Sequence, residues 1–266
     1  DNRIYTLIVV LAIYWLATFI AFKGINWVGK VSKIGGLIGT IIPSILLIIL
    51  GVYYVASGGT IQMNINDSFL PDLARLDNLV LASSIFLFYA GMEMTGVHVT
   101  EMDNPGKSYP RAVFIGAFIT VLIFVLGTYA LGLIIPEDNI NLTQSLLIGF
   151  DSYFKYIHAS WLSPIIAIAL AFGVLAGVLA WVSGPSKGLL EVGKAGYLPP
   201  FFQKTNKIGV QSNILIIQGV IVTILSLLFV VMPSVQSFYQ ILSQMTVLLY
   251  LIMYLLMFAA AIYLRY

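Results

Sequence analysis

A carboxylate and two glycines interrupt an otherwise apolar run of the sequence. Glu93 lies between Gly91 and Gly96 in YAGMEMTGVH, residues 89–98. At the centre of a bilayer a carboxylate costs roughly 2.5–3.5 kcal/mol or more, and each glycine weakens a helix by about 1 kcal/mol relative to alanine. Such residues indicate a functional site, in which Glu93 could pair with a buried partner, bind a substrate ammonium group or carry a proton.

The same stretch predicts a broken helix. Residues 79–88 are apolar enough for a helix, which could resume over residues 97–102. Unwound backbone inside a membrane is tolerated only where it packs in protein or lines a watered cavity, and its free N–H groups and helix-end dipoles can bind a charged substrate. The alternative is that the glycines only permit close helix packing and Glu93 is hydrogen-bonded to a neighbouring helix. The residues expected to bind substrate here are Ala90, Gly91, Met92 and Glu93.

Histidine and cysteine offer little further chemistry. His98, near one end of the broken segment, could titrate near neutral pH and couple transport to protons, or could simply cap a loop. The chain has two histidines, far apart, and no cysteine. We therefore expect neither a metal site nor a cofactor.

The composition is that of a membrane protein. Of the 266 residues, 60% are hydrophobic and only 9% are charged, whereas an ordinary globular domain is about a quarter charged. The net charge of +2 is too small to indicate a nucleic-acid partner. The apolar runs lack the two-residue alternation of barrel strands. The predicted fold class is an all-α polytopic protein embedded in membrane lipid.

Hydropathy divides the chain into seven apolar spans. Each is long enough to cross the roughly 30 Å hydrocarbon core, which takes about 20 helical residues. The spans cover residues 4–22, 31–56, 78–102, 110–135, 161–186, 211–232 and 237–264.

The basic residues orient these spans. If the first span begins outside, ten of the 13 Lys and Arg residues fall in cytoplasmic segments and only Arg3, Arg75 and Lys155 fall outside. This agrees with the positive-inside rule. The long outer segment 140–161 is apolar on one side and is expected to be helical, either as an interfacial helix anchored by aromatic residues or as an outer gate.

Three stretches resemble a known transporter family. The run FYAGMEMTGVHVTEMDNPGKSYPRA (88–112) resembles the sixth transmembrane helix and following loop of the amino acid–polyamine–organocation (APC) superfamily, and most closely the bacterial glutamate/GABA antiporter family. GVLAGVLAWVSGPSKGLL (173–190) is similar to helix 8 of that family, and MTVLLYLIMY (245–254) to its helix 10.

The resemblance implies an inverted-repeat transporter fold of ten core helices plus two more. The chain would cover helices 4–10, with residues 1–56 as the last two helices of the first repeat and 78–266 as the second repeat. Helices 1–3 and 11–12 would then be missing partners. This fits a sequence that opens with DNRIYTLIVV rather than a methionine and ends with AAIYLRY directly after an apolar run, as expected of a fragment of a longer protein. The chain would then hold only part of the substrate site. Whether two copies form a homodimer is left open.

The resemblance also implies roles for individual residues. Ala90, Gly91 and Glu93 fall on the unwound helix 6 motif. Trp181 falls on an aromatic position at the substrate side of helix 8, and the alternative for it is contact with lipid or core packing.

Helix 10 adds a tyrosine pair. Tyr250 and Tyr254 match residues that line the pathway of the family, and their four-residue spacing puts them on one helical face, although simple packing is the alternative. One departure weakens the GABA assignment: Gly177 stands where the glutamate/GABA exchanger carries a carboxylate.

The expected function is secondary active transport of amino acids by alternating access, as a glutamate/GABA-like antiporter. A proton-coupled symporter of amino acids or polyamines is the alternative. A channel would need a repeated polar filter, and a membrane enzyme would need a nucleophile–base pair or metal cluster; the sequence offers neither.

Overall fold

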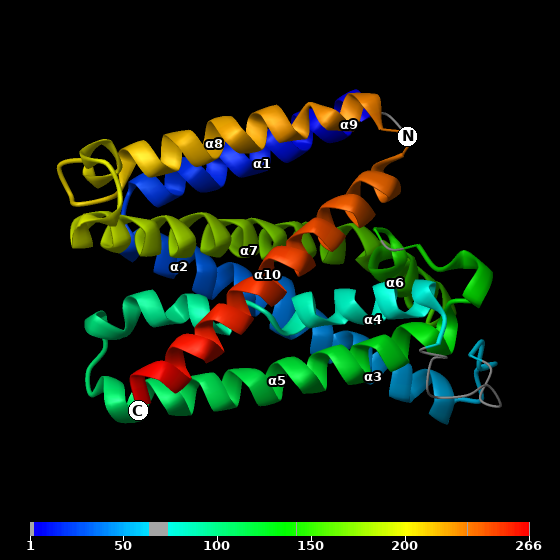
Figure 1. Cartoon of the computed structure of the whole chain (residues 1–266). Coiled ribbons are helices and arrows are strands. Elements are labelled where there is room, and N and C mark those ends of the chain that lie inside the picture. The colour runs from blue at the N-terminus through cyan, green and yellow to red at the C-terminus, as the bar shows by residue number, and fades with distance from the viewer. Residues whose placement is uncertain (1–2, 64–73, 142, 233, 266) are drawn as a thin grey trace.

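The protein is described here by a computed structural model covering residues 3–63, 74–141, 143–232 and 234–265; the side chains of some helical residues, His98 among them, are outside the described part. Within these residues the chain is helical and contains no strand (Figure 1). The all-α fold class is therefore confirmed.

Five described helical segments are long and apolar enough to cross a membrane. Shorter helices, one of them broken, lie at the two remaining predicted spans (Figure 1), so a helix lies at each of the seven predicted positions and five of these are long enough to cross. The five long segments are α1 (Arg3–Phe22), the continuous α2–η1–α3 (Ile25–Gly36, Leu37–Ile41, Ile42–Ala56), α5 (Pro105–Ile134), α7 (Ser163–Val192) with its flanking turns η4 (Ser160–Leu162) and η5 (Gly193–Tyr197), and α10 (Val235–Arg265). The shorter helices are α4 (Leu76–Tyr89) with η2 (Met92–Glu101), and α8 (Ser212–Ser226) with α9 (Leu228–Val231). The remaining elements are η3 (Glu137–Asn139), α6 (Ser145–Tyr156) and η6 (Pro200–Gln203).

Three predicted spans had wrong ends. The second pass begins at Ile25 rather than at 31, α5 begins at Pro105 rather than at 110, and α7 continues to Val192 rather than ending at 186. Each error lies beside lysine or arginine residues, where the apolar run stops. Long basic side chains can extend toward water while their backbone stays helical, so a helix continues past the point where hydropathy falls.

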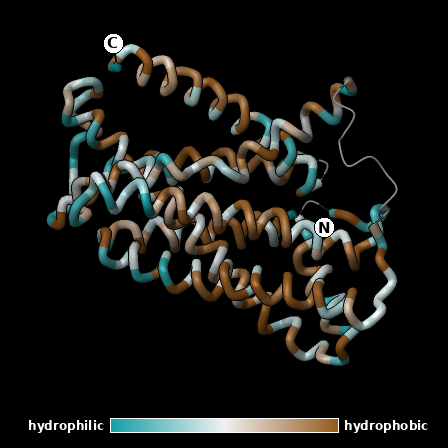
Figure 2. The backbone as a smooth tube through the Cα atoms, turned by 90° about the horizontal axis from the view of Figure 1, so that it is seen from below, coloured by the Kyte–Doolittle hydropathy of each residue, from teal (hydrophilic) through white to brown (hydrophobic). Residues whose placement is uncertain are grey.

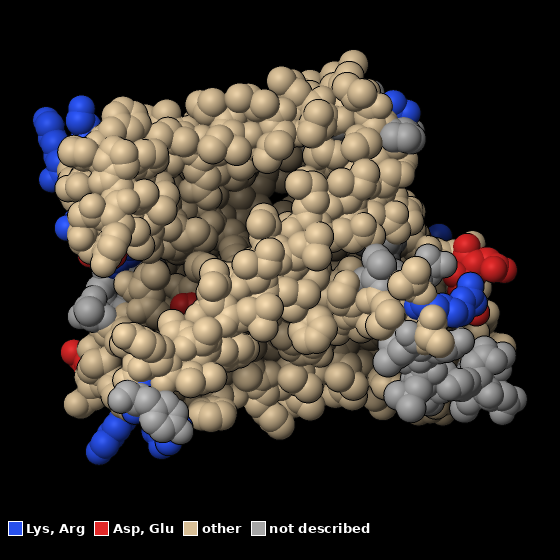
Figure 3. Space-filling view, viewed as in Figure 1, with Lys and Arg blue, Asp and Glu red and all other residues tan. Residues whose placement is uncertain are grey.

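The connections alternate between the two ends of the bundle (Figure 1). The turn after α1, the bend before α5 and the connection from α7 to α8 lie at one end, and α6 lies at the other. Figure 3 shows Lys and Arg at both ends, with more of them at the first, and the largest visible cluster of Asp and Glu at the second. The topology thus groups the loops that the charge pattern predicts to share one side of the membrane.

The second pass and α7 cross with their backbones in contact. A Cβ atom on Gly39 would overlap the backbone of Gly173, and one on Gly173 would lie 2.5 Å from the carbonyl oxygen of Gly39. Gly39 belongs to η1, a π-helical turn. Small residues allow such close approach of membrane helices, which lack a hydrophobic driving force between them.

Helix α6 is part of the protein core rather than an interfacial helix on its surface. Phe150, Tyr153 and Phe154 are fully buried, in a cluster with residues of α3, α5 and α7. The Tyr153 hydroxyl donates a hydrogen bond to the Ala130 carbonyl oxygen of α5. The aromatic residues of this segment therefore anchor it to protein, and the helix is shorter than the 140–161 segment that suggested it.

Helix α10 crosses the face of the bundle and stands apart from most of it (Figures 1 and 2). It contacts α4 and α9, and its only buried residues among those described are Phe238 and Val247. Exposed apolar surface of this extent is typical of a protein face that contacts lipid or further protein.

Candidate functional site

The helix break lies where the sequence predicts it. Helix α4 ends at Tyr89, Ala90 is extended (φ −73°, ψ 152°), and Gly91 is left-handed with φ 106°. Glycine adopts this conformation at little cost because it has no Cβ atom. The chain becomes helical again at Met92, as the 3₁₀ helix η2, rather than at Val97 as expected. The i to i+3 bonds of a 3₁₀ helix close one residue earlier than those of an α-helix, which lets the helix restart directly after the glycine.

Glu93 ties the break to α10. Its Oε2 atom accepts a hydrogen bond from the Gly91 backbone N–H at 3.1 Å and another from the Tyr254 hydroxyl at 3.0 Å. Its Oε1 atom is buried without a hydrogen-bond partner among the described residues. One carboxylate oxygen thus stabilises the break, and the other is left for a proton or a further donor.

A row of aromatic rings connects α7 with α10. Ring centroids are 6.0 Å apart for Trp181 and Tyr250, 5.7 Å for Tyr250 and Tyr254, and 6.2 Å for Tyr254 and Phe258. The first two pairs meet edge to face, a geometry that aromatic rings prefer. The predicted tyrosine pair therefore lies on one face of α10 and faces the predicted tryptophan.

Trp181 also covers the break itself. A Cβ atom on Gly91 would lie 2.9 Å from Cζ2 of the Trp181 ring. Gly91 is thus required twice, by its positive φ and by the ring packed against it. Gly177, one turn earlier on α7, is exposed, with nothing within 4 Å of a Cβ placed there.

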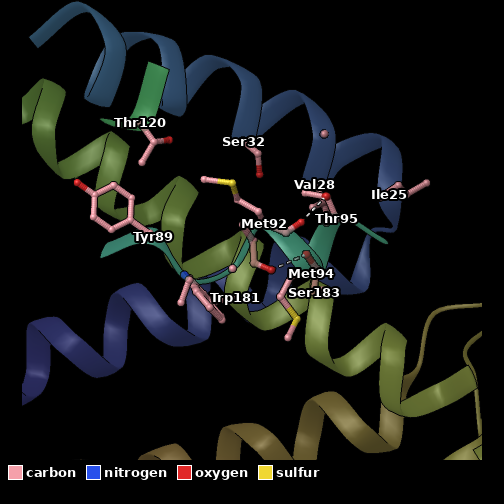
Figure 4. A pocket seen from close by; sticks show the side chains of 15 residues that line it. Ile25, Val28, Ser32, Tyr89, Met92, Met94, Thr95, Thr120, Trp181 and Ser183 are labelled. Carbon is pink, nitrogen blue, oxygen red and sulfur yellow. Dashed lines mark hydrogen bonds between the residues drawn. The ribbon is translucent and has the colours of Figure 1, made fainter. Parts of the chain in front are cut away.

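A cavity of about 490 Å³ lies beside the break (Figure 4). Residues of α2, α4, η2, α5 and α7 line it, and none of them carries a charge. Ala90, Gly91, Met92 and Trp181 belong to both the cavity and the break, whereas Glu93 and the two tyrosines are not among the lining residues. The polar side chains that line it are Ser32, Tyr89, Thr95, Thr120 and Ser183. The Ser32 hydroxyl is buried without a partner among the described residues.

Comparison with known proteins identifies the family of the chain. A family model described as amino acid permease matches residues 1–266. The chain belongs to the amino acid permease family. It is accordingly a member of the APC superfamily and a multi-pass protein of the cell membrane.

Relatives within this permease family are named as transporters. An uncharacterized transporter of Legionella pneumophila is 36% identical over 266 residues, covering 100% of this chain and 57% of the relative. Glutamate/gamma-aminobutyrate antiporters of two Lactococcus lactis strains are 34% identical over 93% of this chain and 33% identical over 80% of it, covering 50% and 43% of the relatives. The chain thus spans about half the length of these curated relatives.

The structure brings six of the seven predicted substrate-binding residues of this permease directly to the break. Ala90 and Gly91 form the break and Met92 is the first residue after it. Glu93 and Trp181 contact Gly91, and Tyr254 contacts Glu93. Tyr250 joins them through its contacts with Trp181 and Tyr254. His98 lies on η2, but its side chain is outside the described part. No group of three His, Asp or Glu side chains that could hold a metal occurs in the described ranges.

Sequence reasoning missed Ser32 and Phe258. Phe258 follows Tyr254 at the four-residue spacing that links the tyrosines, so its position offered a signal. Ser32 offered none, because a serine in an apolar helix is common and only the packing of α2 against the break turns it toward the cavity.

Proposed function

We propose that the chain forms part of a secondary active transporter that exchanges amino acids across the membrane by alternating access. The observation that carries the proposal is the helix break at Ala90–Gly91, tied by Glu93 and covered by Trp181. Broken helices at membrane depth supply backbone groups and helix-end dipoles that bind charged substrate groups in secondary transporters. Its relatives named as glutamate/gamma-aminobutyrate antiporters support exchange rather than one-way transport.

The proposed substrate position is against the break. The amino acid backbone would contact the main chain of Ala90–Met92, and Trp181 with Tyr250 and Tyr254 would act as aromatic gates. No charged side chain lines the cavity. A zwitterion, whose own carboxylate can offset its ammonium group, therefore fits there better than a diamine, whose ammonium groups would need partner charges from the protein. A glutamate/GABA-like exchange is the substrate pair that we propose to test first.

The larger organisation proposed from the resemblance is that residues 1–56 end a first repeat and 78–266 form a second. In that arrangement further helices of the full-length protein would complete the substrate site. Proton-coupled symport is the second candidate, because the Oε1 atom of Glu93 is buried and unpaired among the described residues.

Exchange assays on the full-length protein in proteoliposomes test the proposal. Vesicles are loaded with one unlabelled amino acid at a time, and uptake of labelled glutamate, GABA and a wider panel is followed at acid and neutral pH. We expect uptake only when a substrate is present inside. Uptake driven by an ion gradient into empty vesicles would favour the symporter, and no uptake across the panel would contradict amino acid transport.

A further inference from the structure

Two lysines flank an exposed tryptophan at the end of the bundle where α1 turns into α2. The Nζ atom of Lys23 lies 4.9 Å from the centroid of the Trp27 ring and 4.9 Å from that of Phe19, and the Nζ atom of Lys30 lies 5.9 Å from Trp27. Cation–π contacts at these distances hold an ammonium group beside an aromatic ring. Trp27 is 51% exposed, so the arrangement is open to the surroundings of the protein.

An apolar surface continues from this tryptophan along the second pass. Ile34, Ile38, Ile41 and Ile45 follow at three- and four-residue spacing and are all exposed. Along α2 this spacing keeps Trp27, Lys30 and Ile34 on one side of the helix. The other three isoleucines continue the exposed surface across the π-helical turn η1 and into α3. We call the set Lys23, Trp27, Lys30, Ile34, Ile38, Ile41 and Ile45 the lysine–isoleucine stripe.

The stripe faces away from the protein core. The opposite side of the same helix carries the buried residues Val28, Gly35 and Gly39, and the two glycines contact α7. All seven side chains of the stripe are exposed.

The positive charge at this end is not neutralised by carboxylates. Neither Lys23 nor Lys30 takes part in an ion pair among the described residues. The Asn206 side chain donates a hydrogen bond of 3.0 Å to the Phe22 carbonyl oxygen and so holds the connection between α7 and α8 against this turn. That connection adds the exposed Lys204 and Lys207 to the same end of the bundle, where Figure 3 shows Lys and Arg gathered.

We propose that the lysine–isoleucine stripe binds an anionic phospholipid. The phosphate would lie between the ammonium groups of Lys23 and Lys30 beside the Trp27 indole, and an acyl chain would follow the four isoleucines. Tryptophan is enriched at the membrane–water interface, and lysines there attract anionic headgroups. Two lysines beside an indole, followed by apolar side chains, match the order of a phospholipid from its headgroup into the bilayer.

Lipid binding to the full-length protein tests the site. The protein is purified, delipidated and titrated with phosphatidylglycerol or phosphatidylcholine, and bound lipid is counted by native mass spectrometry. The double variant Lys23→Gln/Lys30→Gln should weaken phosphatidylglycerol binding by roughly 10- to 30-fold, because each lysine near a membrane surface contributes about a fivefold gain in affinity. Binding of the zwitterionic lipid should change little.

The matched control removes two charges elsewhere at the same end. Lys107 and Arg111 are exposed at the start of α5 and are four residues apart, and their substitution by glutamine should leave phosphatidylglycerol binding within about twofold. An equal loss in both double variants would mean that only the general surface charge matters and would overturn the proposal, as would no loss in either.

A fluorescence measurement identifies what covers Trp27. The difference in tryptophan fluorescence between the wild type and Trp27→Phe gives the emission of Trp27. Phosphatidylglycerol with brominated acyl chains should quench this emission. If brominated lipid leaves that emission unchanged, another segment of the full-length protein or a second copy covers the stripe, and the lipid proposal is wrong.

Discussion

At the residue scale, two hydrogen bonds stabilise the Glu93 carboxylate in an otherwise apolar segment. Oε2 accepts from a backbone N–H that the break leaves free and from a hydroxyl on another helix. Hydrogen bonds to a charged group each contribute about 1.5–3 kcal/mol. This is enough to offset much of the cost of placing the carboxylate at membrane depth.

Glu93→Gln should reduce amino acid exchange at least tenfold while membrane insertion is preserved. The amide keeps the shape of the side chain but loses the negative charge that strengthens both hydrogen bonds. It also removes the carboxylate oxygen that could accept a proton. Counterflow in proteoliposomes measures exchange, and the amount of protein recovered in the membrane measures insertion. Unchanged exchange with an unchanged pH profile would remove Glu93 from the mechanism.

Tyr254→Phe tests the hydrogen bond between α10 and Glu93 while the Glu93 charge is kept. It removes the hydroxyl donor but keeps the ring that contacts Tyr250 and Phe258. We expect a smaller loss of exchange than for Glu93→Gln. With each loss of exchange rate converted to a free energy, the loss in the double variant should be less than the sum of the two single losses. Additive losses in a double-mutant cycle would contradict a shared hydrogen bond.

Gly91→Ala should impair both folding and exchange. An added methyl group meets the Trp181 ring at 2.9 Å, and alanine disfavours a φ of 106°. Strain of this kind costs about 1–3 kcal/mol. Thermal unfolding and exchange are compared with Gly116→Ala on α5, where nothing lies within 4 Å. Equal melting temperatures for the two variants would show that the break does not depend on Gly91.

The sequence could identify the residues of the break but not the residues that face it. Gly91 and Glu93 are unfavourable in an apolar helix, so their presence alone indicates a special conformation. Ser32 and Trp181 are ordinary in a membrane helix, and Trp181 came only from the resemblance. Their proximity to the break depends on how α2 and α7 pack, which spacing along one helix does not determine.

At the element scale, the crossing of the second pass with α7 sets the distance between the longest helices. Gly173→Leu should therefore lower the melting temperature and reduce the folded yield, because its Cβ atom would meet the Gly39 carbonyl oxygen at 2.5 Å. Overpacking of this kind usually costs about 1–3 kcal/mol. Gly177→Leu, one turn later on α7 where the surface is open, is the control and should unfold like the wild type. Similar melting temperatures for both leucine variants would contradict the backbone contact.

Helix α6 is joined to the start of α7 through Asp151. Lys155 hydrogen-bonds its carboxylate at 2.6 Å and Ser163 does so at 2.9 Å, and these contacts hold the pKa of the Asp151 carboxyl below its usual range. A lowered pKa in the folded state means that the charged form contributes stability above the unfolded pKa of about 3.9, and that this is lost as the pH falls through the folded pKa.

Asp151→Asn should therefore destabilise the protein at pH 7, and this loss should shrink as the pH falls below about 4 and disappear below the folded pKa. The effect at pH 7 should be less than about 1 kcal/mol, because the pair is largely exposed to solvent. Melting temperatures at pH 7 and over an acid series from pH 4 downward measure it. Asp138→Asn, at an exposed aspartate of the same end, should leave them unchanged, and a pH-independent loss for Asp151→Asn would contradict the ion pair.

Helix number followed from the sequence, whereas helix ends and irregular turns did not. The apolar runs predicted a helix at each of the seven positions, five of them long enough to cross a membrane, because a bilayer requires a minimum length of apolar helix. The π-helical turn over Leu37–Ile41 and the 3₁₀ form of η2 gave no signal. Both depend on local packing, at the Gly39–Gly173 crossing and beside the glycine of the break.

At the scale of the whole molecule, the chain exposes apolar faces and spans about half the length of its curated relatives. Family membership and the membrane location follow from the whole chain. The division into two repeats stays a prediction, and so does the substrate pair. The central claim is narrower: substrate binds against the break at Ala90–Gly91.

Substrate protection of a cysteine at the break tests that claim most directly. Ala90→Cys is introduced into a version of the full-length protein without other cysteines, and its reaction with a thiol reagent is timed with and without the substrate identified by counterflow. Gly106→Cys, exposed at the start of α5 and away from the break, is the control. We predict that saturating substrate slows labelling at position 90 at least fivefold and leaves position 106 unchanged. Equal labelling rates at position 90 with and without substrate would show that the substrate binds elsewhere.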